Sequence, residues 1–136
     1  DWWMKEDIEF PKVERVGVCA IPEESDGKTY WKVQVINMLD KPITNVLVAA
    51  KGYGKKESKE VATSELRHYF EEIPSKSLKS VEVIPDDLVG LSNQYWVSFY
   101  IDSEIFDKKF IFLPETLIEK NLTHIPIIDQ LGILII

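Results

Sequence analysis

The stretch that decides the fold is YWVSFYIDSEIFDKKFIFL, residues 95–113. Two segments dense in β-branched and aromatic residues flank Asp102-Ser103, and this pattern predicts a hairpin with a two-residue turn in which Phe99 faces Phe106. Because side chains alternate along a strand, one face presents a core set: Tyr95, Val97, Phe99, Phe106, Phe110 and Phe112. The other face presents Trp96, Tyr100, Ile105 and Ile111 around Ser98, Asp107 and Lys109. That second face is half apolar, and we expect something to cover part of it.

Further strands are predicted on both sides of the hairpin because apolar residues recur there with period two. They fall at 13–21, 29–36, 43–50 and 80–84, between polar loops at 22–27, 37–42 and 52–60. Residues 63–72 fit a short helix or a strand, and we favour the strand because an isolated helix of about ten residues is marginal. Single helical turns are predicted at 86–90 and 115–120. The sequence thus predicts an all-β fold: one immunoglobulin-like two-sheet β-sandwich over residues 1–136, with one or two short helical turns.

Composition disfavours several classes of protein. The 136 residues carry 23 acidic and 16 basic side chains, and the net charge of −7 repels a phosphate backbone, so we expect no binding to nucleic acid. No apolar run reaches the ~18–20 residues of a membrane helix and no signal peptide is recognised, so we expect no membrane association and a cytoplasmic location. Residues 1–6, which begin Asp1-Trp2-Trp3, are expected to be a disordered end or a remnant foreign to the natural protein.

Candidate chemical groups are few. Glu71 and Glu72 are adjacent, so on a strand they point to opposite faces and cannot form an acid–base pair. The single Cys19 lies among apolar neighbours, which indicates a buried thiol, and with only two histidines a Cys/His zinc site is disfavoured. The dipeptide Arg67-His68 looks the most functional, although Arg67 would face away from His68 on a strand. The sequence therefore predicts no catalytic residue, no metal site and no cofactor.

The C-terminal segment from Ile125 to Ile136 is too apolar to lie free in water. Each fully buried side chain of this kind stabilises folding by ~1.5–3 kcal/mol. We expect the tail to fold back within its own subunit, as an extra edge strand or as a cap on the half-apolar face of the hairpin. The alternative is a two-fold dimer that exchanges both tails. The short connection favours the intrachain arrangement, and with it a monomer.

Five segments carry a resemblance to a family of small uncharacterised bacterial proteins: DIEFP at 7–11, NVLVAAKGYG at 45–54, TSELRH at 63–68, YWVSF at 95–99 and DKKF at 107–110. The chain resembles this family over nearly its whole length from Met4. Some members carry the label phenylalanyl-tRNA synthetase alpha subunit. A class II synthetase needs a much longer catalytic domain with arginine-bearing motifs, whereas this acidic chain has only Arg15 and Arg67. The resemblance therefore implies common descent and no catalytic residues.

We accordingly predict a non-catalytic domain that acts as a protein-interaction module for a protein partner that the sequence does not identify. The expected interaction surface comprises Trp96, Tyr100, Ile105, Ile111, Arg67 and His68. One alternative is an enzyme or a tRNA-synthetase-linked accessory protein, in which Arg67, His68 and a carboxylate would converge in a cleft. A further alternative is a glycan-binding module, which requires Trp96 and Tyr100 to be exposed and coplanar.

Overall fold

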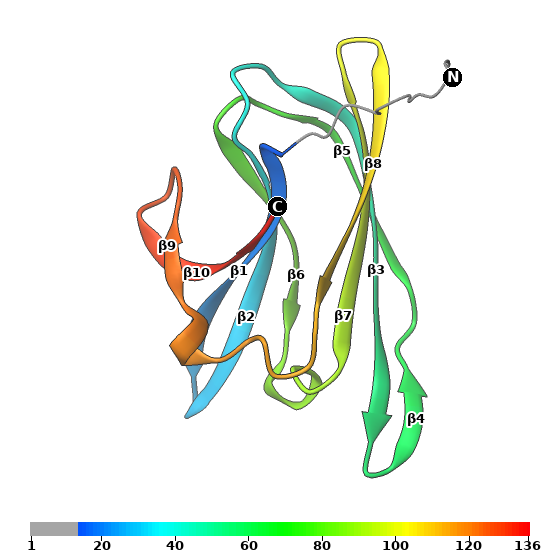
Figure 1. Ribbon diagram of the computed structural model, residues 1–136, viewed down its shortest axis with the longest axis vertical. Helices are drawn as coiled ribbons and strands as arrows, with labels where there is room; N and C mark the ends of the chain where they lie inside the picture. Colours follow the sequence, from blue (N-terminus) through cyan, green and yellow to red (C-terminus); the bar gives the residue numbers. More distant parts are fainter. Residues whose placement is uncertain (1–13) are drawn as a thin grey trace, which may run out of the picture.

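A computed structural model describes residues 14–136 as two antiparallel sheets packed face to face (Figure 1). The first sheet has the order β6-β2-β1-β10-β9, and the second has the order β4-β3-β7-β8, with β5 also paired to β3. The strands are β1 (Val16–Ser25), β2 (Lys28–Asn37), β3 (Ile43–Lys56), β4 (Lys59–Ala62), β5 (Leu66–Ile73), β6 (Ser77–Ile84), β7 (Ser92–Ile101), β8 (Glu104–Phe112), β9 (Thr123–Ile125) and β10 (Gln130–Ile135). Two single 3₁₀ turns, η1 (Asp86–Leu88) and η2 (Glu119–Asn121), interrupt them. The predicted immunoglobulin-like β-sandwich is confirmed.

The predicted N-terminal features fall outside the part of the chain that the structure describes. These are the extension at residues 1–6, the first residue of the strand expected at 13–21, and the first of the five segments of family resemblance.

The β7–β8 hairpin has the predicted register. Ile101 pairs with Glu104, and Phe99 pairs with Phe106. The rings of Phe99 and Phe106 stack with centroids 5.7 Å apart. Asp102 adopts φ 55°, as a tight two-residue turn requires. Of the predicted core face only Phe106, near the hairpin end, remains partly exposed.

The main core lies between the two sheets. Strands of the first sheet contribute Trp31 and a set of valines, and the second sheet contributes the aromatic face of the hairpin. The large residues with under 2% exposure include Tyr95, Phe99, Phe110, Phe112, Ile43, Ile73 and Ile84. Lys108 lies among the aromatic residues of β8, and its Nζ donates a hydrogen bond to the carbonyl oxygen of Val16 at 3.2 Å. This bond ties β8 to the first sheet and closes that side of the sandwich.

A second, smaller cluster covers the outer face of the first sheet. It consists of Cys19, Ile21, Ile36, Met38 and Ile125, with Leu78, Ile128 and Leu134 packed against it. Since β1 lies between this cluster and the main core, every residue from Val16 to Ile21 is buried. A near-continuous apolar run is typical of a strand buried on both faces.

The C-terminal tail forms β10, which pairs with β1 of the same chain at Val18–Ile135 and Ala20–Ile133. The tail thus forms an extra strand in the sheet of its own chain, although β9 and not β10 is the edge strand. The predicted cap on the hairpin is wrong, because the tail lies in the first sheet and leaves the outer face of the β7–β8 hairpin uncovered. The reason is β1, whose free edge offers backbone hydrogen bonds that a cap on side chains could not supply.

Two predicted loops are instead strands with tight turns. β1 continues through Pro22 to Ser25, and only Asp26 and Gly27 turn, with φ of 52° and 76°. β3 likewise runs through Gly52-Tyr53-Gly54 to Lys56, and Glu57 and Ser58 turn with φ of 53° and 67°. Positive φ at both central residues is the conformation that matches the twist of a two-residue hairpin. The ambiguous segment 63–72 forms β5, as favoured, and the helical turn predicted at 86–90 is η1.

We predict that Phe99→Ala lowers the free energy of unfolding by ~3–5 kcal/mol, the range for a large aromatic side chain truncated in a core. Phe99 is 0% exposed and stacks on Phe106. Urea denaturation followed by circular dichroism measures the change. A loss below ~1 kcal/mol would show that this face of the hairpin does not line the core.

Docking of β10 on β1 depends on glycine. A Cβ at Gly132 would lie 2.7 Å from the carbonyl oxygen of Ala20, so the two strands would have to separate. We predict that Gly132→Ala destabilises the fold by ~1–3 kcal/mol, as overpacking does. The control is Gly90→Ala, because a Cβ there has no atom within 4 Å; its stability should be unchanged or raised by up to ~1 kcal/mol. Equal effects of the two changes in thermal denaturation would contradict the β1–β10 contact.

Candidate functional site

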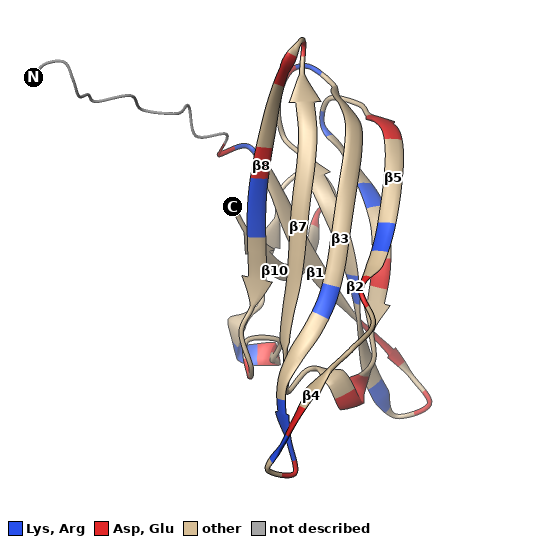
Figure 2. Ribbon diagram, turned by 90° about the vertical axis from the view of Figure 1, so that its right-hand side faces the viewer, with Lys and Arg blue, Asp and Glu red and all other residues tan. Residues whose placement is uncertain are grey.

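The outer face of the second sheet carries side chains in rows set by the strand register. Ala49 of β3 lies between Arg67 of β5 and Trp96 of β7, and Trp96 in turn pairs with Lys109 of β8. In the adjacent row Leu47 lies between Tyr69 and Ser98. Four different strands therefore build one continuous surface, seen face-on in Figure 2.

Large apolar side chains dominate the middle of this surface. We call them the sheet-face patch: Leu47, Tyr69, Trp96, Tyr100, Ile105 and Ile111. Leu47, Tyr69 and Ile105 are each more than half exposed, and Trp96 is 46% exposed. The β7 ribbon at the centre carries no charged residue (Figure 2). Such contiguous exposure of apolar groups marks interaction surfaces more often than scattered surface residues do.

Polar contacts hold several of these side chains in place. The Tyr69 hydroxyl donates a hydrogen bond to Asn45 Oδ1 at 2.7 Å, and Asn45 adopts φ 47° where the β3–β7 register shifts. Lys109 Nζ lies 5.8 Å from the centre of the Trp96 ring, within cation–π range. Arg67 pairs with Glu65 at 3.0 Å. The charges near the patch thus have mixed sign: Arg67 lies on β5, and Asp107 and Lys109 lie on β8 between Ile105 and Ile111.

Five of the six residues predicted for the interaction surface lie on this face: Trp96, Tyr100, Ile105, Ile111 and Arg67. His68 does not, because it pairs with the inward-facing Val48 and points into the sandwich. Its Nε2 is buried without a hydrogen-bond partner. Sequence reasoning missed Leu47 and Tyr69. Alternation puts Leu47 and Tyr69 on the faces opposite Val48 and His68, but one sequence does not reveal which strands are neighbours.

Groups with catalytic potential are dispersed. Cys19 has no exposed surface, and burial raises the pKa of its thiol to about 12, so it stays protonated at neutral pH. His124 of β9 contacts Asp129 in the β9–β10 turn at 2.8 Å, and it is remote in sequence from His68. Within residues 14–136 no three side chains of His, Cys, Asp or Glu group together in a way that could hold a metal ion.

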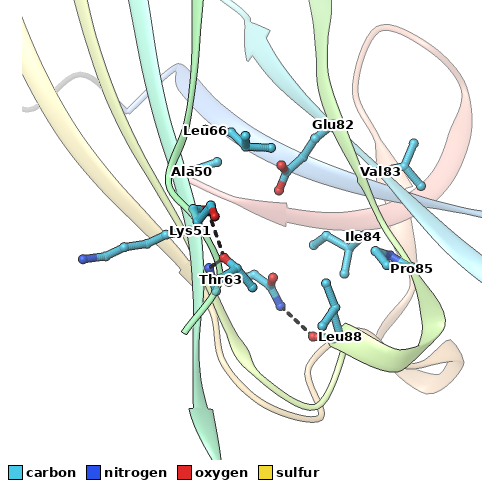
Figure 3. A pocket seen from close by; sticks show the side chains of 12 residues that line it. Ala50, Lys51, Thr63, Leu66, Glu82, Val83, Ile84, Pro85 and Leu88 are labelled. Carbon is cyan, nitrogen blue, oxygen red and sulfur yellow. Dashed lines mark hydrogen bonds between the residues drawn. The ribbon is translucent and has the colours of Figure 1, made fainter. Parts of the chain in front are cut away.

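A second feature is a cavity of about 270 Å³ between the β5 and β6 edges of the two sheets (Figure 3). Its walls include Leu66, Ile84 and Leu88, and the carboxylate of Glu82 points between them. The Tyr95 hydroxyl donates a hydrogen bond of 2.6 Å to Glu82 Oε2. Burial, reinforced by the Glu82 charge, raises the pKa of Tyr95, so this hydroxyl remains a donor.

The sequence and fold were compared with known proteins, and no protein-family model, curated protein or solved structure matches the chain. The resemblance to small bacterial proteins therefore stays a prediction. The described residues also contain no helix of the length and apolarity needed to cross a membrane.

The exposure of the sheet-face patch predicts that folding does not depend on it. Leu47 and Val48 are neighbours on β3, but Leu47 is 52% exposed and Val48 only 1%. We predict that Leu47→Thr changes the free energy of unfolding by no more than ~0.5 kcal/mol, as at most surface positions. Val48→Thr should cost ~1–3 kcal/mol because it buries a hydroxyl in the core. Chemical denaturation compares the pair, and similar losses would mean that Leu47 is covered in the folded protein.

Proposed function

We propose that the protein is a non-catalytic protein-interaction module that binds a partner protein through the sheet-face patch. The observation that carries this proposal is the contrast between the two outer faces of the sandwich. On the first sheet most outer apolar residues pack together in the second cluster, and Val83 is exposed beside it. The second sheet leaves Leu47, Tyr69 and Ile105 more than half exposed on a single face.

The composition of the patch suits a protein partner. Tyrosine and tryptophan are enriched at protein interfaces because they bury a large area at a small cost in side-chain entropy. Trp96 and Tyr69 are exposed on strands, whose hydrogen-bonded backbone restricts them before binding. The mixed charges of Arg67, Lys109 and Asp107 lie among and beside these apolar groups and would set the orientation of the partner.

The enzyme alternative has less support. Arg67 and His68 are adjacent on β5, so they point to opposite faces of the sheet and cannot act together on one substrate. Arg67 is already paired with Glu65 in solvent. A catalytic cleft needs acid, base and anion-binding groups that converge, and these two diverge.

The glycan alternative also has less support. Trp96 and Tyr100 lie four residues apart on β7, roughly 13 Å along the strand, so their rings do not form a single platform for one sugar. Lys109 already lies over the Trp96 ring. The identity of the partner, the cytoplasmic location and the monomeric state stay predictions of the sequence.

Site-specific crosslinking tests the proposal. A photoreactive phenylalanine analogue replaces Trp96 or Tyr69, and the control position is Leu131, which is 56% exposed on β10 of the first sheet. In cells of the source organism, we predict an adduct of one discrete mass from both patch positions and none from Leu131. Leu47→Asp should abolish the adduct because it places a charge at the centre of the interface.

Two outcomes would contradict the proposal: the same adducts from Leu131 as from the patch, or adducts that persist unchanged with Leu47→Asp. An adduct between two copies of the chain would retain the patch as an interface and replace the predicted monomer by a homodimer. Light scattering of the purified protein checks this directly against the chain mass of 15.7 kDa.

A further inference from the structure

The two long sides of the sandwich are built differently. On the β8 side, the Lys108–Val16 hydrogen bond joins the sheets. On the opposite side, β5 and β6 are the free edges of their sheets and do not pair with each other. The cavity of about 270 Å³ opens there. Leu66 of β5 and Val83 of β6 line the cavity on its two sides. They are 51% and 52% exposed.

Glu82 faces this cavity because of its place in the register of β6. It pairs with Val33, whose side chain is fully buried, and the β2–β6 register then shifts between Val33 and Gln34. The carboxylate accepts one hydrogen bond, from Tyr95. Within residues 14–136 no cation and no second donor contacts it, although a carboxylate has about four acceptor positions.

A half-buried carboxylate with apolar neighbours is costly to desolvate unless a charged donor meets it. Here the Tyr95 hydroxyl fixes the orientation of Glu82, while Ile84 and Leu88 provide an apolar wall alongside (Figure 3). Lys51 also borders the cavity, but its side chain runs away from the other lining groups, and its Nζ lies 6.0 Å from the Tyr53 ring centre on the outer face. Lys51, the basic residue that lines the cavity, therefore directs its ammonium group away from Glu82.

We propose that this cavity binds a primary ammonium group on an aliphatic stem, with the ammonium on Glu82 and the stem against Leu66, Ile84 and Leu88. A free alkylamine and the side chain of an exposed lysine share this chemistry. Both place three N–H donors beside the free acceptor positions of Glu82, and both bury a short hydrocarbon chain. The site is separate from the sheet-face patch, since Glu82 and Leu66 point to the interior of the sandwich.

The test is a titration of the ¹⁵N-labelled protein followed by amide chemical shifts, in about 0.15 M salt to screen the general negative charge. The probes are n-butylammonium, lysine with blocked α-amino and α-carboxyl groups, and n-butanol as the neutral analogue. We expect saturable shifts confined to amides that border the cavity, including Gly52, Ser64 and Val83, with either ammonium probe. Glu82→Gln keeps an oxygen for Tyr95 but removes the charge, and it should weaken binding by at least about tenfold.

The matched control is Glu71→Gln, an equal loss of charge at an exposed position of β5, which should leave the affinity unchanged. Binding of the blocked lysine identifies a protein lysine as an occupant that the site accepts, and binding of n-butylammonium alone identifies a small amine. The proposal is overturned if neither probe binds, if n-butanol binds equally well, or if the shifts spread over the acidic surface and survive Glu82→Gln.

Discussion

The packing of the two sheets depends on two buried carboxamides at opposite ends of the sandwich, those of Asn37 and Asn93. Within residues 14–136 they are the only buried residues of a polar or charged type. Asn37 Nδ2 lies 3.0–3.1 Å from the carbonyl oxygens of Lys41, Ile73 and Pro74. One side chain therefore joins the crossing from β2 to β3 with the crossing from β5 to β6. Asn93 stabilises a single crossing, from β6 to β7, where its Nδ2 donates hydrogen bonds to the carbonyl oxygens of Leu88 and Leu91. Buried amides that are satisfied in this way fix one arrangement of the chain, because any other leaves them without partners.

Local patterns in the sequence predicted the hairpin in detail, since residues 95–113 contain both strands, their turn and their alternation. Alternation along β3 likewise separates Val46 and Val48, which the structure buries, from Leu47, which it exposes. The predictions that failed have two causes, a missing local turn signal and contacts distant in sequence. Glu57 and Ser58 lack the glycine or asparagine that usually marks a tight turn, so β4 was missed. The destination of the tail could not be predicted either, because it is set by the free edge of β1 and by the close backbone approach that Gly17 and Gly132 permit.

The candidate site likewise contains residues that the sequence predicts and residues that only the fold brings together. The face containing Trp96, Tyr100, Ile105 and Ile111 followed from the hairpin alone. Leu47 and Tyr69 joined it only once β3 and β5 were placed beside β7. The cavity at Glu82 had no counterpart in the sequence, because its walls come from β3, β5, β6 and β7 and from the turn η1. Sites made by neighbouring residues of one hairpin are visible in a sequence, whereas sites made between sheets appear only with the fold.

The β1–β10 pairing has a mechanical consequence. Val18, near the start of the described chain, pairs with Ile135, near its end, and the two strands run antiparallel. A force that pulls these two ends apart acts across the strands and loads their hydrogen bonds one at a time, beginning at Val18. The hydrogen bonds between β1 and β10 therefore break in sequence. In shear, with the force along the strands, they would bear the load together. Because Leu134 of β10 packs against the second cluster, separation of β10 from β1 would expose the side of that cluster around Cys19 to solvent.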